Sequence, residues 1–174
     1  CEDIAATNPC GEQPLPPYGA CLLGSFNLTQ YVLSTGFDEA GYAEDIAVVV
    51  RAMDNIIDRT IYPLPQQEHE AKDKRRMGLG VTGLANAAEM LGYSYGSDEF
   101  MVFTSRVLEM LRDEAYSTSA DLAAEKGSFP LYQHDYYTVG NYFKTLPEWL
   151  QSKIRSQGIR NSHLTSIAPT GTIS

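Results

Sequence analysis

Hydrophobic and polar positions along the chain predict two long helices. In 38–60, apolar side chains recur every three or four residues, the period of a helix with one buried face. A second helix is predicted from Ser97, a typical N-cap, to Lys126, with Gly127 as its end. The predicted buried faces are Ile46, Val49, Val50, Met53, Ile56 and Ile57 in the first helix, and Phe100, Phe103, Val107, Met110, Leu111 and Leu122 in the second.

Shorter apolar stretches predict strands at 21–28 and 160–168, the second broken by Pro169. Further helices are predicted over 84–91 and 147–158, the latter carrying Trp149, Leu150 and Ile154. Strands that alternate with long helices are typical of an α/β protein. Irregular structure is predicted for the proline-rich residues 1–20 and the aromatic residues 128–145.

A glycine-rich stretch, Gly78-Leu79-Gly80-Val81-Thr82-Gly83, matches the GxGxxG fingerprint of dinucleotide-binding proteins, and Asp98 follows at about the expected 20 residues. Its context does not fit. Residues 68–76 are mostly charged where a buried strand is required, and Asp98 lies at a predicted helix start. We therefore expect these glycines to allow close backbone packing at the start of helix 84–91.

Composition places the chain among globular proteins, with 43% hydrophobic and 20% charged residues in 174 positions. A net charge of −9 argues against a nucleic-acid surface, and no apolar run approaches the roughly 20 residues of a membrane span. Three cysteines without an export signal indicate a reducing, cytoplasmic location. We expect the local basic cluster on a solvated face: Lys72, Lys74, Arg75 and Arg76.

Candidate chemistry is concentrated in Thr7-Asn8-Pro9-Cys10-Gly11-Glu12-Gln13-Pro14-Leu15. Pro9 fixes its own φ and Gly11 permits positive φ, so this stretch predicts a rigid loop. An amide, a thiol and a carboxylate stand two residues apart and project toward one side of an extended loop. The same residues are also compatible with a proline-rich surface turn that holds a structural cysteine.

Several further stretches carry a resemblance to a known family. They are Ala20-Cys21-Leu22-Leu23-Gly24-Ser25-Phe26-Asn27-Leu28, Arg75-Arg76-Met77-Gly78-Leu79-Gly80-Val81, Gly158-Ile159-Arg160-Asn161 and Ile167-Ala168-Pro169-Thr170-Gly171-Thr172-Ile173-Ser174. With the stretch around Cys10, the chain resembles the large catalytic subunit of ribonucleotide reductase along essentially its whole length. It is most similar to class II, the adenosylcobalamin (vitamin B12)-dependent branch.

The resemblance implies a partial ten-stranded α/β barrel, with the catalytic cysteine on a central finger loop. Residues 1–174 would be an internal fragment of the catalytic barrel domain, with the finger loop at 7–17 and a phosphate-binding loop at 168–174. Residue 1 is cysteine and residue 174 falls inside a motif, as expected of such a fragment.

The resemblance also implies residue roles in reducing ribonucleotides to 2′-deoxyribonucleotides for DNA synthesis. Cys10 would carry a thiyl radical that takes the 3′ hydrogen of the ribose. Glu12 would deprotonate the 3′ hydroxyl, and Asn8 would hold the ribose hydroxyls. Substrate contacts would come from Asn8, Pro9, Cys10, Gly11 and Glu12, and the phosphates would bind Pro169, Thr170, Gly171, Thr172, Ile173 and Ser174.

Cys21 matches one half of the redox-active cysteine pair, whose partner lies upstream in the family. The implied partners are a ribonucleotide, a thioredoxin-like dithiol reductant, the missing parts of the enzyme, and a second subunit in a homodimer; nucleic acid and membrane are not implied. Two groups receive no role. His69, His134 and His163 share no metal-ligand spacing, and Tyr136-Tyr137 precedes the phosphate loop, whereas the class I radical-relay pair follows it.

Two alternatives stay open at this point. The chain is also similar to a class I large subunit, which takes its radical from a metal-containing partner protein. It is also compatible with an inactive or split-enzyme piece that needs other chains, because the upstream redox cysteine and the rest of the barrel are missing. We therefore expect no reductase activity from the isolated 174 residues.

Overall fold

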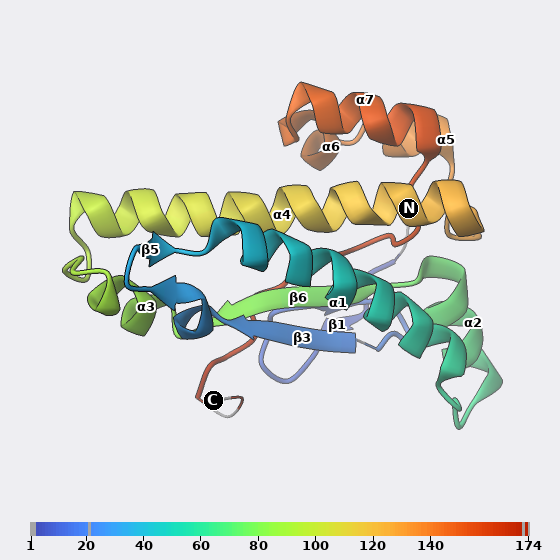
Figure 1. Ribbon diagram of the computed structural model, residues 1–174. Coiled ribbons are helices and arrows are strands. Elements are labelled where there is room, and N and C mark those ends of the chain that lie inside the picture. Colours follow the sequence, from blue (N-terminus) through green and yellow to red (C-terminus); the bar gives the residue numbers. More distant parts are fainter. Residues whose placement is uncertain (1–2, 21, 172, 174) are drawn as a thin grey trace.

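The computed structural model describes residues 3–20, 22–171 and 173, and has a mixed α/β fold (Figure 1). Its strands are β1 (Ala6–Thr7), β2 (Pro14–Leu15), β3 (Leu22–Asn27), β4 (Val32–Leu33), β5 (Gly36–Phe37) and β6 (Met77–Thr82). Its helices are the 3-10 helix η1 (Leu28–Tyr31) and α1 (Glu39–Arg59), α2 (Pro65–Lys74), α3 (Leu84–Met90), α4 (Asp98–Lys126), α5 (His134–Tyr137), α6 (Asn141–Thr145) and α7 (Glu148–Gln157). None of the described helices is long and apolar enough to cross a membrane.

The two long helices, α1 and α4, form where the apolar periodicity predicts them. The Asp38 carboxylate caps α1 by accepting from Gly41 N at 3.0 Å, and the Ser97 hydroxyl caps α4 by accepting from Phe100 N at 3.2 Å. Helix α7 likewise matches its prediction, with Leu150 buried and Trp149 exposed. The helix caps and most of the apolar faces of α1, α4 and α7 are therefore readable from local sequence. The prediction is wrong for Ile56, which is 45% exposed because it lies at the edge of the buried face.

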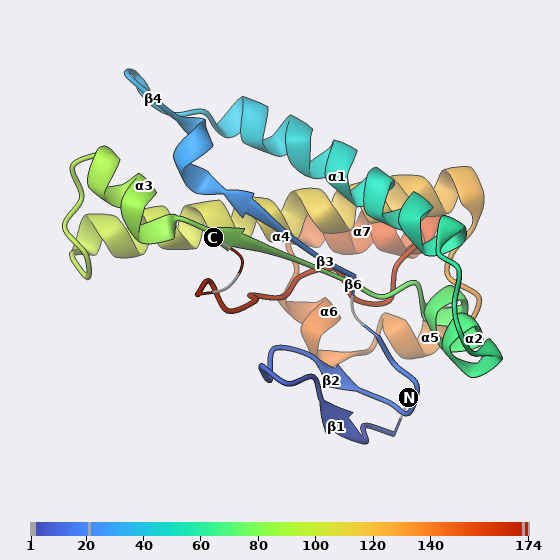
Figure 2. The ribbon, with the colours of Figure 1, turned by 90° about the horizontal axis from the view of Figure 1, so that it is seen from below.

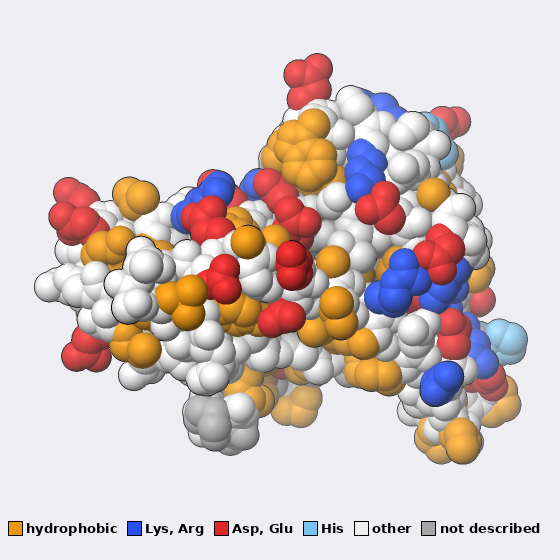
Figure 3. Space-filling view, in the orientation of Figure 1, with side chains coloured by type: hydrophobic (Ala, Val, Ile, Leu, Met, Phe, Trp, Pro, Cys, Tyr) orange, Lys and Arg blue, Asp and Glu red, His pale blue; other side chains and the backbone are white. Residues whose placement is uncertain are grey.

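Helices α1 and α4 pack side by side and share ion pairs at the surface. Arg51 lies 2.7 Å from Glu125, and Arg106 lies 2.7 Å from Glu39. Acidic and apolar side chains are interspersed over these two helices on the face seen in Figure 3. Exposed pairs of this kind each contribute about 0.2–1 kcal/mol, so the helix pair is stabilised mainly by its buried side chains.

The central sheet is a parallel pair, β3 and β6, in register from Leu22↔Met77 to Asn27↔Thr82. The predicted strand at 160–168 is wrong as a regular strand, because it forms a single parallel bridge, Leu79↔Thr165. Met77 N and Leu79 N, two residues apart, donate to the carbonyls of adjacent residues 163 and 164. Two donors that are two residues apart thus bind acceptors that are one residue apart, and this offset interrupts the regular ladder of hydrogen bonds. The α/β class is confirmed, and the described strands do not close a barrel.

Strand β6 runs through the glycine-rich stretch itself, which the sequence did not predict. Met77, Leu79 and Val81 face the hydrophobic core, with exposures of 0%, 0% and 5%, so the two-residue period of a strand is present. Gly78 and Gly80 alternate with them. The glycines do allow close packing, but inside a strand rather than at the start of α3.

The basic cluster is only partly solvated, contrary to prediction. Helix α2 buries no residue, and it ends at Arg75 in the left-handed conformation with φ 51°. The backbone turn carries Arg75 and Arg76 inward, where their exposed fractions are 3% and 6%. Residues 1–20 and 128–145 are also more regular than predicted, because they contain the β1–β2 hairpin and helices α5 and α6.

Gly80→Ala is expected to lower the stability of the intact protein by about 1–3 kcal/mol. A β-carbon at residue 80 would lie 2.4 Å from the main-chain oxygen of Ser166. Strand β6 and the 160–168 segment would then have to separate. The thermal unfolding midpoint measures the effect, with Gly171→Ala as the control because a β-carbon there meets nothing within 4 Å. Equal midpoints for the two variants would contradict this packing.

Candidate functional site

The stretch around Cys10 forms the turn of a hairpin. Strands β1 and β2 pair antiparallel, Ala6 with Leu15 and Thr7 with Pro14, and residues 8–13 join them. Within the turn, Gly11 N donates to the Asn8 carbonyl at 3.0 Å, and Gly11 has φ 81°, which its lack of a side chain permits. The proline and glycine positions thus give a defined turn instead of a mobile loop.

Asn8 closes the base of this turn with both its main chain and its side chain. Asn8 N donates to the Gln13 carbonyl at 3.2 Å, and Gln13 N donates to Asn8 Oδ1 at 3.0 Å. The amide oxygen therefore fixes the turn. The amide also carries an Nδ2 group with two N–H donors.

Cys10 and Glu12 occupy different environments in the turn. Cys10 is an exposed free cysteine. Glu12 is half-buried, and its Oε2 is shielded from solvent yet has no hydrogen-bond partner among the described residues. A carboxylate oxygen that is shielded and unpaired is a strong potential acceptor. The turn thus presents a reachable thiol next to an acceptor without a protein partner.

The hairpin makes one contact with the 160–168 segment and one with β6 beside it. The Ser166 hydroxyl donates to the Glu12 carbonyl at 3.0 Å. The Gln13 side chain, 4% exposed, lies over Gly78, where a β-carbon would come within 2.5 Å of Gln13 Nε2. Since Gly78 has no β-carbon, the hairpin can sit directly on the sheet.

The final segment of the chain lies beyond Ser166. Ala168 is buried, and Pro169, Thr170, Gly171 and Ile173 are exposed, with 170–171 in a turn. The hairpin turn and this segment lie on the same side of β3 and β6 in both ribbon views (Figures 1 and 2). The hydrogen bond between Ser166 and Glu12 thus brings the predicted finger loop close to the segment that leads into the predicted phosphate loop. The predicted residues Cys21, Thr172 and Ser174 lie outside the described residues.

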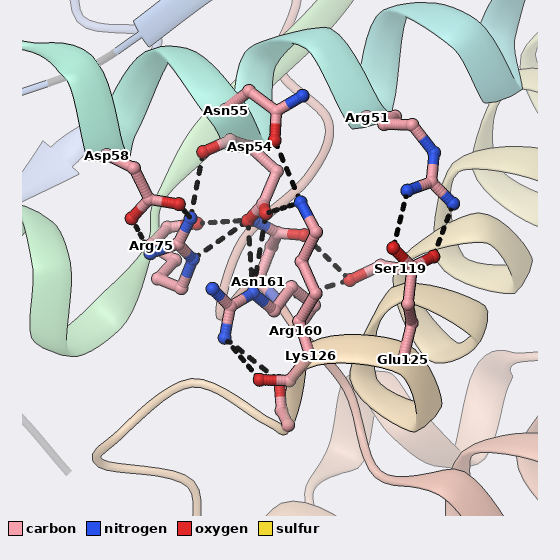
Figure 4. A network of polar contacts seen from close by, with 11 residues as sticks. Arg51, Asp54, Asn55, Asp58, Arg75, Ser119, Glu125, Lys126, Arg160 and Asn161 are labelled. Carbon is pink, nitrogen blue, oxygen red and sulfur yellow. Dashed lines mark hydrogen bonds and ion pairs between the residues drawn. The ribbon is translucent and has the colours of Figure 1, made fainter.

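A buried polar network lies where β6 begins (Figure 4). Asp54 of α1 is fully buried and accepts from Arg75 Nε at 2.8 Å and from Asn161 Nδ2 at 3.1 Å. Arg75 also binds Asp58, whose pKa is lowered by that hydrogen bond. These contacts join α1, the residues that precede β6 and the start of the 160–168 segment.

Asn161 and Arg160 extend this network to α4. The Ser119 hydroxyl donates to Asn161 Oδ1 at 2.9 Å and accepts from Asn161 N at 3.1 Å. Arg160 Nη1 donates to the carbonyl of Gly127 at 3.0 Å, just after α4. Two of the stretches singled out in the sequence, around Arg75 and Arg160, therefore meet and set where β6 and the 160–168 segment begin.

A cavity of about 680 Å³ lies elsewhere, between α5, α6 and residues 162–165. Its walls are largely aromatic, and burial raises the pKa values of Tyr116 and Tyr137 there. Among the predicted site residues that the structure describes, none lines this cavity. The hairpin is therefore the candidate site.

Sequence reasoning missed the residues that support the hairpin and the network. Ser166 and Gln13 carry no local signal, because their roles come from contacts with distant segments. Asp54 did carry one. It falls on the same helical face as Val50, Met53 and Ile57, and an acid on a buried stripe calls for a buried cation.

Comparisons with known proteins agree with the resemblance seen in the sequence. The profile of the family "Ribonucleotide reductase, barrel domain" matches residues 1–174. The vitamin B12-dependent ribonucleoside-diphosphate reductase of Mycobacterium tuberculosis (strain CDC 1551 / Oshkosh) is 38% identical over 98% of this chain and 22% of its own length. The protein of the same name from Thermoplasma acidophilum is 38% identical over 99% of this chain and 21% of its own length.

The ribonucleoside-diphosphate reductase subunit alpha of Chlamydia muridarum is 34% identical, over 88% of this chain and 17% of its own length. The chain thus spans about a fifth of the length of the curated relatives it matches. The family profile covers every residue of the sequence, and the chain therefore belongs to the ribonucleotide reductase barrel-domain family.

Proposed function

We propose that the intact protein containing this chain reduces ribonucleotides to 2′-deoxyribonucleotides by thiyl-radical chemistry at Cys10. One observation carries the proposal. An exposed thiol stands between Asn8 and Glu12 on one turn, and that turn is tied by Ser166 to the segment that runs into Pro169. The arrangement is suited to a substrate whose ribose faces the turn and whose phosphates face the end of the chain.

In this proposal the Cys10 sulfur is the group that exchanges hydrogen atoms with the substrate. As a thiyl radical it takes the hydrogen atom from C3′, which forms the S–H bond and leaves the radical on C3′. Because the S–H bond and the activated C–H bond have similar strengths, the hydrogen can return to C3′ at the end of the turnover. The exposure of Cys10 at the tip of the hairpin supports this role.

Glu12 and Asn8 would act on the ribose hydroxyls beside Cys10. Glu12 would accept the proton of the 3′ hydroxyl, and its shielded, unpaired Oε2 is suited to that task. Asn8 Oδ1 already binds Gln13 N, so the Nδ2 group would hold the substrate hydroxyl. Because the oxygen and the nitrogen of the Asn8 side chain would have separate partners, the turn would stay closed while substrate binds.

Cys21 would supply reducing equivalents together with a second cysteine upstream in the intact protein. The 2′ hydroxyl leaves as water after taking a proton from the pair. The second proton and two electrons of the pair pass to the ribose, which gains hydrogen at C2′ as the two thiols form their disulfide. An external dithiol, of the thioredoxin type, would restore the pair by exchange.

The segment from Pro169 to Ser174 would hold the substrate phosphates. Its sequence, Pro169-Thr170-Gly171-Thr172-Ile173-Ser174, offers hydroxyl groups and main-chain N–H groups, both of which bind phosphate oxygens. The exposure of Thr170 and Gly171 in a turn supports access for an anion.

Adenosylcobalamin is the cofactor that we assign to the intact protein. Two relatives at 38% identity are named vitamin B12-dependent, and the one named subunit alpha is 34% identical, which favours class II over class I. The residues present fit such a group in one respect, because the Cys10 thiol is exposed and can be reached from outside the hairpin. When bound, the cofactor would supply the radical that removes the hydrogen atom of that thiol.

We place residues 1–174 as an internal piece of a ten-stranded barrel domain, with 7–17 as its finger loop and 168–174 as its phosphate loop. The family profile over 1–174 and the parallel pairing of β3 with β6 support this placement. The intact enzyme would be a homodimer.

The test is an assay of the intact protein for deoxynucleotide formation with a ribonucleoside diphosphate or triphosphate and a dithiol. We expect turnover when adenosylcobalamin is added and no metal-containing subunit is present. The isolated 174 residues should give none, because they lack the upstream cysteine and the rest of the barrel. Activity that ignores adenosylcobalamin and requires a metal-containing subunit would overturn the class II assignment, and no activity under either condition would overturn the proposed function.

A further inference from the structure

We propose that Ser166 is a positioning residue that holds the Cys10 turn at a fixed distance from the phosphate-binding segment. This inference rests on the proposed function and concerns a residue outside the two predicted site regions. Its basis is one hydrogen bond between segments 154 positions apart, from Ser166 Oγ to the main-chain oxygen of Glu12 at 3.0 Å.

The acceptor of that bond lies inside the reactive turn. Glu12 is the proposed base and stands two residues after Cys10, so a bond to its carbonyl restrains the main chain that carries both groups. Without Ser166, the turn would still be closed internally by Asn8 and Gln13. It would then be held to the sheet chiefly by the packing of Gln13 over Gly78, so the turn would move more and its internal hydrogen bonds would open more often.

Ser166 is itself held by β6. Its N–H donates to the Leu79 carbonyl at 2.8 Å, and the neighbouring Thr165 forms the parallel bridge with Leu79. A β-carbon on Gly78 would lie 2.9 Å from Ser166 Cβ, and one on Gly80 would lie 2.4 Å from the Ser166 oxygen. The two glycines therefore let the segment sit close to the strand. The hairpin is thus tied to a buried strand, not to another loop.

The same residue leads directly into the phosphate-binding segment. Ala168, two residues later, is buried, and Pro169 follows it. Ser166 therefore connects to the phosphate segment through the chain and to the catalytic turn through its hydroxyl. A misplacement of about 1 Å can cost about 100-fold in rate. A residue that fixes the distance between the phosphate-binding segment and the Cys10 sulfur would therefore affect turnover more than substrate binding.

The experiment is Ser166→Ala in the intact protein. We expect kcat to fall about 5- to 50-fold, from the lost hydrogen bond and the looser turn. The dissociation constant of the nucleotide should change less than about 2-fold, since the phosphate contacts remain. Ser166→Thr keeps a hydroxyl and should restore most of the rate. Ser162→Ala is the matched control, because the Ser162 hydroxyl pairs with His163 and not with the hairpin.

Two results would overturn the proposal: a wild-type kcat in Ser166→Ala, or an equal loss in Ser166→Thr and Ser166→Ala. A readout without catalysis separates this inference from the proposed function. Amide hydrogen exchange in residues 8–13 should be faster in Ser166→Ala than in wild type and unchanged in Ser162→Ala. If the wild-type protein has no reductase activity, the function fails, and the exchange rates still decide whether Ser166 restrains the hairpin.

Discussion

Replacing Cys10 with serine in the intact protein is expected to abolish ribonucleotide reduction and leave nucleotide binding largely intact. The O–H bond of serine is much stronger than the S–H bond of cysteine, so serine cannot exchange a hydrogen atom with the ribose. The exposed Cys10 side chain contributes little to packing, and the turn is closed by Asn8, Gly11 and Gln13. Product formation and the nucleotide dissociation constant, measured on the same preparation, separate the two effects.

Two further cysteine substitutions sharpen this result. Cys1→Ser is the matched control, because Cys1 belongs to no motif that we can assign, and it should keep the wild-type rate. Cys21→Ser should spare radical formation and block sustained reduction by a dithiol, since its proposed part is to deliver electrons. Turnover of Cys10→Ser within tenfold of wild type would rule out a thiyl radical at this position.

The sequence predicted the long helices well because their signals are local. In α1 and α4, capping groups and an apolar period of three to four residues lie within the element itself. Strand β6 was not predicted, because charged residues precede it and two of its six positions are glycine. Burial from both sides makes it a strand: the core packs against Leu79, and Gln13 and Ser166 cover Gly78.

The candidate site, too, could be predicted from the sequence only in part. The turn at 8–13 could be predicted, because proline and glycine restrict the backbone at known positions. Its attachment to the sheet could not, because the hydrogen bond from Ser166 to Glu12 joins residues 154 positions apart. The basic cluster was misplaced for a related reason. A run of Lys and Arg indicates solvent exposure, whereas the left-handed turn at Arg75 and the distant Asp54 bring the arginine inside.

Asp54→Asn is expected to destabilise the region around β6 by about 3–5 kcal/mol, the usual cost of removing one partner of a buried ion pair. Asparagine has nearly the same shape, so the loss comes from charge and hydrogen bonding. An amide cannot provide acceptors on both terminal atoms, whereas Asp54 accepts from Arg75 and Asn161 at Oδ1 and from Arg160 at Oδ2. Amide exchange of Met77 and Leu79, which bond to the 160–168 segment, should accelerate about 100-fold or more.

Asp58→Asn is the matched comparison, because Asp58 binds the same arginine from the surface. Its side chain is 47% exposed, against 0% for Asp54. Solvent screens the Asp58 pair, so its loss should cost at most about 1 kcal/mol. Equal effects of the two substitutions would mean that burial does not set the strength of this network. A selective effect of Asp54→Asn would mean that one buried carboxylate on α1 fixes the start of both segments on which the Cys10 turn rests.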